Sequence, residues 1–231
     1  MTTIAELTNL IELHGIMLVT KKVFWEDPYQ TQLSTRIAGV TNENITLEET
    51  IFYAFSGGQE SDAGTIGGYP VIAAAKQGLD IVYTLPADHG LQPGQTVEVQ
   101  IDWNRRYRLM RLHFAAEMVL QLVYKHAPGI ERIGAHISED KARIDFAREG
   151  SISALFPMIE REAAALIAAD LPIITAFEDE QSQHRYWEVL GFSRMACGGT
   201  HPRNTLEIGS IKLKRKNTGK GKERIEIMLG A

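Results

Sequence analysis

Residues 105–125 read RRYRLMRLHFAAEMVLQLVYK, and their apolar side chains recur every three or four positions. This period predicts one long helix with a broad apolar face, formed by Leu109, Leu112, Ala116, Val119, Leu120 and Val123. His113 and Glu117 are four positions apart, so they share a side of that helix. A carboxylate on the inner side costs several kcal/mol unless it is paired or bound to a metal. The stretch therefore predicts both a central helix and a polar site on it.

A second cluster lies far along the chain, where residues 197–201 read Cys-Gly-Gly-Thr-His. Cys197 is the single cysteine, and the two glycines after it let the backbone fold tightly around a ligand. With His201, His113 and Glu117 it offers one thiolate, two imidazoles and one carboxylate, a set that fits a tetrahedral zinc centre. The alternative is structural: Cys197 is a small buried apolar residue, His113 a hydrogen-bonded core histidine, and Glu117 the partner of a nearby arginine.

Composition restricts the class of protein. The 231 residues are 44% hydrophobic and 23% charged, as in ordinary globular proteins. No apolar run approaches the ~20 residues that cross a membrane, and the N-terminus lacks the features of a signal peptide. One cysteine excludes an internal disulfide framework. We therefore expect a cytoplasmic protein that binds neither membranes nor DNA. A net charge of −5 argues against a coat of nucleic acid, but leaves room for a local basic patch.

The first hundred residues carry mostly strand patterns. A helix is predicted near residues 4–15 and ends at Gly15. Short strands are then predicted, separated by glycine and proline, at residues 33–37, 50–55, 70–75, 80–85 and 96–101. This spacing is typical of a small β-barrel, so we predict a β-barrel domain over residues 1–101.

After Asp102 the pattern changes, and residues 102–231 are predicted to form an α+β domain. Its long helix is followed by a hairpin over residues 136–146, a helix over 151–170, a strand over 173–176 and a helical piece over 180–190. Two strands, 207–214 and 224–229, end the chain. The predicted fold class is therefore α+β: a small β-barrel domain, then a domain with a long metal-bearing helix. Oligomeric state is not predicted.

Two further segments have both a structural and a functional interpretation. Residues 56–65 hold Gly57-Gly58-Gln59, either a plain hairpin turn or a backbone that approaches a ligand closely, with Gln59 as amide donor and acceptor. The C-terminal run is either a solvated hairpin or a contact for a phosphate backbone. Its basic residues are Lys212, Lys214, Arg215, Lys216, Lys220, Lys222 and Arg224. Arg105, Arg106, Arg108 and Arg111 form a second, weaker basic cluster.

These pieces, in this order, resemble the free-standing alanyl-tRNA editing proteins, relatives of the editing domain of alanyl-tRNA synthetase. The resemblance covers nearly the whole chain. The segments that carry it are residues 50–64 with Gly57-Gly58-Gln59, 102–113 with His113, 134–146, and 197–209 with the Cys-Gly-Gly-Thr-His motif.

The resemblance implies a deacylase that hydrolyses the ester joining a wrong amino acid, chiefly serine and sometimes glycine, to tRNA(Ala). It implies Zn²⁺ held by His113, Glu117, Cys197 and His201. Thr50, which matches a residue that senses the serine hydroxyl, Gln59 and Glu117 are the expected catalytic residues. A site built to bond a hydroxyl rejects the substrate that lacks one. Arg105 and the C-terminal run are expected to contact the tRNA.

The chain departs from the family pattern at Glu117, where histidine is usual, and at Ser56 and Glu60 in the glycine-rich motif. Glu117 is a fourth zinc ligand, or the base for a zinc-bound water, or a sign of weakened metal binding; we favour the first. Three rival functions remain: a release factor, which also uses Gly-Gly-Gln; an RNA-binding relative that has lost catalysis; and a metal-binding regulatory protein without tRNA affinity.

Overall fold

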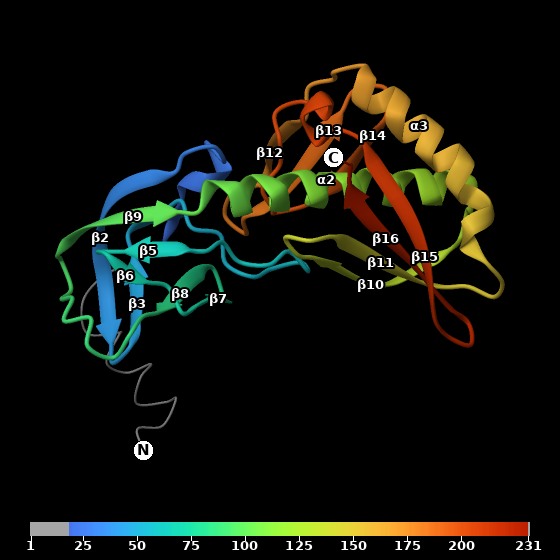
Figure 1. Cartoon of the computed structure of the whole chain (residues 1–231). Coiled ribbons are helices and arrows are strands. Elements are labelled where there is room, and N and C mark those ends of the chain that lie inside the picture. Colours follow the sequence, from blue (N-terminus) through green and yellow to red (C-terminus); the bar gives the residue numbers. More distant parts are fainter. Residues whose placement is uncertain (1–18, 231) are drawn as a thin grey trace.

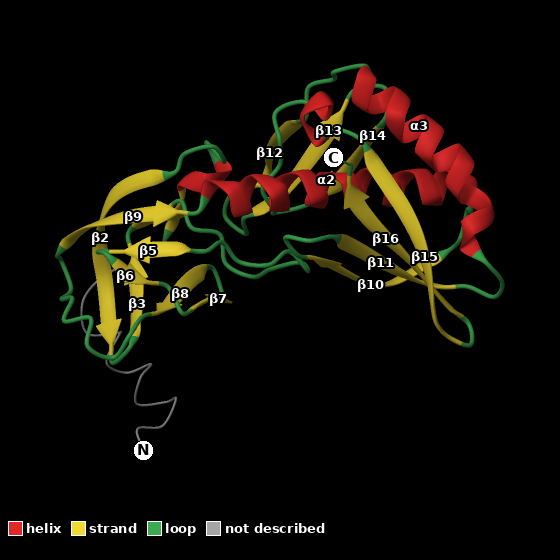
Figure 2. Ribbon diagram, viewed as in Figure 1, coloured by secondary structure: helices red, strands yellow, loops and turns green. Residues whose placement is uncertain are grey.

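The computed structural model describes residues 19–230 (Figure 1). The predicted helix near residues 4–15 lies outside this range. Within it the chain is mixed α and β, and both α-helices lie in the second part, whereas the first part is built mainly of strands (Figure 2). None of the helices in residues 19–230 is both long and apolar enough to cross a membrane.

The first part forms a seven-stranded antiparallel sheet with the order β6-β5-β9-β2-β3-β8-β7. Its long strand β2 pairs with β9 through its first half and with β3 through its second, with an irregularity between Ile37 and Gly39. The sheet is therefore curved, but β6 and β7 are its free edges in the described residues, so the predicted closed barrel is not confirmed. The strands are β2 (Gln32–Thr41), β3 (Asn44–Leu47), β5 (Gly64–Ile66), β6 (Tyr69–Pro70), β7 (Ala73–Gln77), β8 (Asp80–Thr84) and β9 (Thr96–Ile101).

A two-stranded parallel pair, β1 (Lys21–Lys22) and β4 (Glu49–Thr50), accompanies this sheet, and the 3₁₀ turn η1 (Val23–Trp25) follows β1. The strand predicted over residues 50–55 is wrong beyond Thr50. There the backbone N–H groups bond to side chains instead of a neighbouring strand: Phe52 to Thr50 Oγ1 at 3.0 Å and Tyr53 to Asp62 Oδ2 at 2.7 Å. The run of apolar residues predicted a strand, but it could not predict that these N–H groups bond to side chains.

Helix α2 (Trp103–His126) confirms the helix predicted over residues 105–125. Asp102 caps it, because its carboxylate accepts a hydrogen bond from the N–H of Arg105 at 3.2 Å. All residues from Leu112 to Leu120 are buried, so the middle of the helix is covered on every side and not on one apolar face alone. The helix therefore holds its polar residues inside the protein.

Around α2 lie a four-stranded sheet, β10-β11-β16-β15, and a three-stranded sheet, β12-β13-β14. Helix α3 (Phe156–Ala168) packs against α2 beside them (Figure 1). The strands are β10 (Glu131–Ile137), β11 (Ala142–Ala147), β12 (Ile174–Asp179), β13 (His184–Val189), β14 (Ser193–Ala196), β15 (Ile211–Gly219) and β16 (Lys222–Leu229), and the 3₁₀ turns are η2 (Ile152–Leu155) and η3 (Thr205–Ile208). The predicted hairpin over residues 136–146 is confirmed by β10 and β11.

The helical piece predicted over residues 180–190 is wrong, because β13 occupies most of it. Arg185, Trp187 and Val189 are buried and their neighbours are not, which is the period of a strand and not of a helix. The buried apolar residues form two clusters. The N-terminal cluster contains residues from Val23 to Ile101, and the C-terminal cluster contains residues from Leu109 to Ile227.

Candidate metal centre and adjoining pocket

Four potential metal ligands converge beside the middle of α2. His113 and Glu117 lie one turn apart on the helix, and the loop after β14 brings Cys197 and His201 to the same point. One ligand atom of each residue lies within 4.8 Å of the others. The four residues that sequence spacing singled out are thus together in space and could hold a metal ion.

The distances between donor atoms suit an ion at the centre. Glu117 Oε1 lies 3.2 Å from His113 Nε2, and Glu117 Oε2 lies 2.9 Å from His201 Nε2. Cys197 Sγ lies 3.4 Å from His113 Nε2. A tetrahedral zinc ion with ordinary bond lengths separates its ligands by roughly 3.3–3.6 Å. Small movements would therefore convert the present contacts into ligand bonds.

The charges of the group also favour a divalent cation. Burial raises the pKa of Glu117, but the facing His113 and His201 outweigh burial and lower it well below its usual range. Burial and the neighbouring Glu117 raise the pKa of the Cys197 thiol. A cation would reverse that effect, and a thiolate and a carboxylate together balance two positive charges. The buried centre would then be neutral, which lowers the cost of burying it.

The two glycine-rich motifs meet at this group. Gln59, from the loop before β5, is fully buried, and its side-chain oxygen accepts a hydrogen bond from His113 Nδ1. Its amide nitrogen donates to Thr200 Oγ1 at 3.0 Å. A Cβ on Gly199 would lie 2.1 Å from the ring of His113. Only glycine allows the second motif to pass so close to the histidine.

A pocket of about 360 Å³ adjoins the group and is lined by residues of both parts of the chain. Trp25, Tyr53 and Lys76 line it from one side, and His184, Arg185 and Cys197 line it from the other. Cys197 is the member of the metal-ligand group that faces the pocket, since His113, Glu117 and His201 are buried behind it. A ligand in the pocket would therefore meet the group on its sulfur side.

Arg185 is a pocket residue that the sequence analysis missed. Its side chain is buried against the rings of Phe177 and Trp25, at 4.4 and 5.2 Å from their centroids. Its guanidinium donates to the Trp25 carbonyl at 3.3 Å, and it forms no ion pair with a carboxylate in residues 19–230. Burial lowers its pKa. The period-two pattern of β13 was the available signal, but the prediction of a helix there concealed it.

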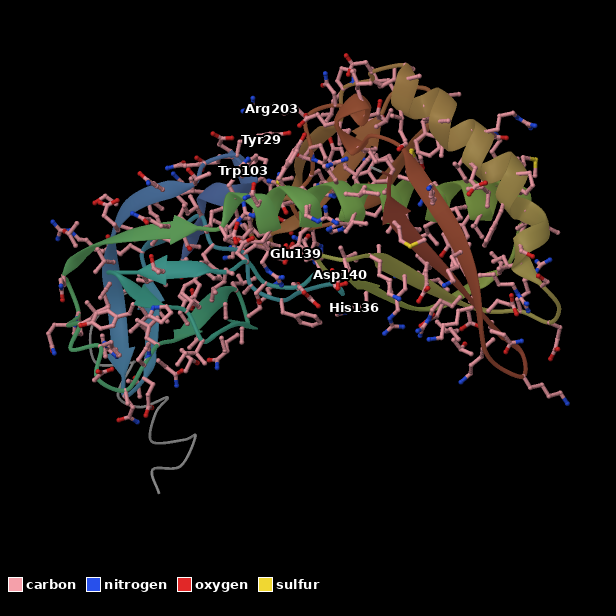
Figure 3. All side chains as sticks on the ribbon, in the orientation of Figure 1. Tyr29, Trp103, His136, Glu139, Asp140 and Arg203 are labelled. Atoms are coloured by element: carbon pink, nitrogen blue, oxygen red, sulfur yellow. The ribbon has the colours of Figure 1, made fainter. Side chains whose placement is uncertain are left out.

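Two predicted site residues lie elsewhere. Thr50 is fully buried, its hydroxyl 2.7 Å from the hydroxyl of Tyr83, and it is not a lining residue of the pocket. Arg105 forms ion pairs with Glu60 at 2.7 Å and Glu139 at 3.0 Å. Glu139 lies with His136 and Asp140 below α2, around the turn between β10 and β11 (Figure 3). Arg105 therefore joins the helix to the glycine-rich loop and to this turn.

The strand pairing sorts the C-terminal basic residues into two groups. Lys212, Lys214 and Lys216 alternate along β15 and are exposed on one face of the sheet, whereas Lys220 lies at the tip and Lys222 starts β16. Arg215 points the other way and forms a bidentate pair with Glu223 at 2.6 Å. Arg224 pairs with Asp145 at 2.6 Å. The three alternating lysines thus form no ion pair in the described residues.

Comparison with known proteins agrees with this geometry. The family model described as the threonyl and alanyl tRNA synthetase second additional domain matches residues 185–226, which include Cys197 and His201. The alanyl-tRNA editing protein AlaX-M of Pyrococcus horikoshii is 30% identical over 91% of this chain and 98% of its own length. Its namesake in Methanosarcina barkeri is 31% identical over 91% of this chain and 99% of its own length.

A longer protein also matches. The alanine–tRNA ligase of Staphylothermus marinus is 34% identical over 84% of this chain, and the match occupies 24% of the ligase. The similarity to the free-standing proteins covers nearly all of both chains. The chain therefore belongs to the family of alanyl-tRNA editing proteins.

Proposed function

We propose that this chain is a cytoplasmic deacylase that hydrolyses the ester bond of mischarged aminoacyl-tRNA(Ala). Seryl-tRNA(Ala) is the main proposed substrate and glycyl-tRNA(Ala) the second. The observation that carries the proposal is the four-ligand group beside a pocket with both aromatic and cationic walls, in a chain of this family. We assign the pocket's two walls to two domains, residues 1–101 and 102–231, in keeping with the two hydrophobic clusters.

We propose Zn²⁺ as the metal and His113, Glu117, Cys197 and His201 as its ligands. Mixed nitrogen, sulfur and oxygen donors of this kind suit zinc better than magnesium or calcium, which prefer oxygen alone. When bound, zinc would supply a positive charge that polarises the ester carbonyl or a water molecule. Four protein ligands fill a tetrahedral site. With Glu117 bound, all four positions would be taken, whereas without it one position would remain for water or substrate.

The pocket residues would bind the acylated end of the tRNA. Trp25 and Tyr53 offer flat apolar surface for the terminal base, because base stacking on aromatic rings accepts any base. Arg185 would bind an anionic or carbonyl oxygen of the substrate, because a buried guanidinium without a carboxylate partner is a strong hydrogen-bond donor. Thr50 stays the proposed sensor of the serine hydroxyl, which requires that its own hydroxyl, now bonded to that of Tyr83, become accessible to the substrate.

Glu117 has two proposed roles that exclude each other. As a ligand, it would bind the cation through an oxygen that now faces a histidine Nε2. As a base, it would leave three ligands and hold the proton that a water molecule loses on attacking the ester. We favour the ligand role, because the carboxylate lies between the two imidazoles, with an oxygen facing each.

We further propose that the tRNA backbone crosses the face of the four-stranded sheet that displays Lys212, Lys214 and Lys216. Exposed lysines on alternate positions of a strand point the same way, so they form a row of positive charge that can neutralise several phosphates. Lys220, Lys222, Arg215, Arg224 and Arg105 were predicted as contacts as well. The ion pairs of the three arginines make them the weaker candidates.

The test is to measure zinc content and ester hydrolysis on the same preparations. The substrates are seryl-, glycyl- and alanyl-tRNA(Ala), and the variants are Cys197→Ala and Glu117→Ala. His126→Ala is the matched control, since His126 lies on the same helix but pairs with Glu162 away from the centre. We expect one zinc per chain in the wild type and the control, cleavage of the seryl ester, and an intact alanyl ester.

The variants separate the interpretations. Loss of zinc and of hydrolysis together in Cys197→Ala supports the metal-dependent deacylase. Loss of zinc in Glu117→Ala supports the ligand role, whereas zinc retained with hydrolysis lost supports the base. Wild-type protein that binds tRNA(Ala) but cleaves none of the three esters would overturn the proposal and identify an RNA-binding relative without catalysis.

A further inference from the structure

The side-chain amide of Gln59 is buried, and both its oxygen and its nitrogen bond to groups of the protein. Its oxygen accepts from His113 Nδ1 and faces the backbone nitrogen of Thr200 at 3.4 Å. Its nitrogen donates to Thr200 Oγ1 at 3.0 Å, and its exposed fraction is 0%. Both acceptor sites of the oxygen are thus in use, and a side chain with no exposed surface does not present its amide to a substrate in the pocket. Gln59 is therefore better placed to act on His113 than on the reacting ester.

The orientation of the amide determines where His113 carries its hydrogen. The N–H of Thr200 can only donate, so the Gln59 atom that faces it is the carbonyl oxygen. The same oxygen faces His113 Nδ1, so Nδ1 must be the protonated nitrogen. In the neutral ring this leaves a lone pair on Nε2. That atom faces Cys197 Sγ at 3.4 Å and Glu117 Oε1 at 3.2 Å.

The loop that carries Gln59 is held rigidly. Ile137 of β10 donates to the Gly58 carbonyl at 2.8 Å and accepts from the N–H of Glu60 at 3.0 Å. A Cβ on Gly58 would lie 2.8 Å from the Ala135 carbonyl, and Gly58 has a φ of +91° that favours glycine. The backbone on both sides of Gln59 is thus fixed against β10, and its side chain is held by its own bonds to His113 and Thr200.

We infer that Gln59 is a positioning residue that fixes His113 in the tautomer with hydrogen on Nδ1 and so prepares Nε2 to bind the cation. Partners that hold the second nitrogen of a ligating histidine raise its basicity and fix its ring. The inference deepens the proposed function, because it rests on the proposed metal centre. It replaces the expectation that Gln59 touches the substrate.

The test compares Gln59→Leu with Gln59→Glu. Leucine fills a similar volume without an acceptor, whereas the glutamate carboxylate still accepts from Nδ1. Gln121→Leu is the matched control, since Gln121 lies on α2 and bonds to Ser193 and Met195 but to no histidine. The tautomer is read from ¹⁵N NMR of the histidines in metal-free protein, with the His113 signals identified by their loss in His113→Ala. Zinc affinity is measured by competition with a chromophoric chelator.

We expect Gln59→Leu to lose the single His113 tautomer and to bind zinc about 10- to 100-fold more weakly. Gln59→Glu should keep hydrogen on Nδ1 and bind zinc within a few-fold of the wild type, as should Gln121→Leu. An unchanged tautomer and unchanged zinc affinity in Gln59→Leu would overturn the inference. If Gln59→Leu does not fold, Gln59→Glu decides: a loss of the Nδ1 hydrogen there has the same meaning. Neither readout requires ester hydrolysis, so both stand apart from the test of the proposed function.

Discussion

Arg185 is a buried cation that lines the pocket. A buried guanidinium normally pairs with a carboxylate, yet this one packs against two aromatic rings and donates to a single carbonyl. Hydrogen bonds to charged groups contribute about 1.5–3 kcal/mol. If Arg185 binds the substrate, Arg185→Met should raise the KM for aminoacyl-tRNA by about 10- to 150-fold. The change in kcat should be smaller, and steady-state kinetics would measure both.

Arg203 provides the control for that substitution. It is exposed and stacks on Tyr29 at 4.2 Å, outside the pocket and above α2 (Figure 3). Arg203→Met removes the same charge and should leave KM within twofold. An equal rise of KM in both variants would mean that net charge, and not the pocket, determines the effect of Arg185.

Lys22 should make the free energy of unfolding depend on pH. Burial lowers its pKa from 10.5 to about 8, although its amine donates to the carbonyls of Thr20 at 3.0 Å and Leu79 at 2.5 Å. Between pH 8 and 10.5 the unfolded chain binds a proton here that the folded chain has lost. The free energy of unfolding should therefore rise with pH across this window relative to the Lys22→Met variant.

Urea unfolding at pH 8 and at pH 10 measures this rise for the wild type and for Lys22→Met. Lys21→Met is the control, because Lys21 is exposed and its ion pairs with Glu26 and Glu49 raise its pKa. The difference between wild type and Lys21→Met should show no rise with pH. If the difference in free energy of unfolding between the wild type and Lys22→Met also does not change with pH, the pKa of Lys22 is not lowered.

The metal-ligand group could be predicted because each half of it is local. His113 and Glu117 are adjacent on any helix, and Cys197 and His201 share one tight loop. Other contacts could not be predicted. Gln59 meets Thr200 across 141 positions of sequence, and Arg105 was assigned to tRNA although two carboxylates bind it. A residue's type suggests what it can bind, but only the fold decides which partner reaches it first.

At the scale of the element, the β15–β16 hairpin contains two kinds of basic residue that the sequence does not distinguish: exposed lysines and arginines in ion pairs. Lys212, Lys214 and Lys216 share one exposed face, whereas Arg215 is held by Glu223. Each phosphate contact contributes roughly 0.7–0.9 to the slope of log K against log salt. Changing all three lysines to glutamine should therefore reduce that slope by roughly 2.1–2.7 and weaken tRNA binding, as measured by titration at several salt concentrations.

Arg161→Gln is the matched control for the lysine variant. Arg161 is an exposed cation on α3, which packs against α2. Its loss should leave the salt slope unchanged. If the triple variant keeps the wild-type slope, the RNA does not cross this face.

Periodicity predicted elements well where it was unambiguous. The 3.6-residue period predicted the ends of α2 to within two residues. The turn between β10 and β11 was predicted in its correct place. The failure at residues 180–190 has a physical cause, since a run of mixed aromatic and charged residues fits both periods. There the antiparallel pairing with β12 and β14 decides, and pairing between strands is a tertiary interaction that a short window cannot contain.

At the scale of the whole molecule, the site depends on how the two hydrophobic clusters are joined. The pocket draws one wall from residues 22–81 and the other from residues 178–198, and the glycine-rich loop of the first part supplies Gln59 to the metal group of the second. A fully buried ion pair lies at this junction. Arg106 of α2 binds both oxygens of Asp62, and also donates to the carbonyls of Pro28 at 2.9 Å and Ile51 at 2.6 Å.

This pair should be the most sensitive point of the junction. Removing one partner of a buried ion pair leaves a charge without compensation and costs about 3–5 kcal/mol. Arg106→Met should therefore lower the free energy of unfolding by that amount, and adding Asp62→Asn should restore part of it, because the uncompensated carboxylate is gone. Urea unfolding measures both. Lys141→Met is the comparison. Its amine bonds to the buried Glu226 at 2.6 Å, but the Lys141 side chain is 43% exposed, so its loss should cost less than that of Arg106. A loss in Arg106→Met as small as that in Lys141→Met would mean that apolar packing alone holds the two parts in register. The glycine-rich loop would then depend on its bonds to β10 for its place beside His113.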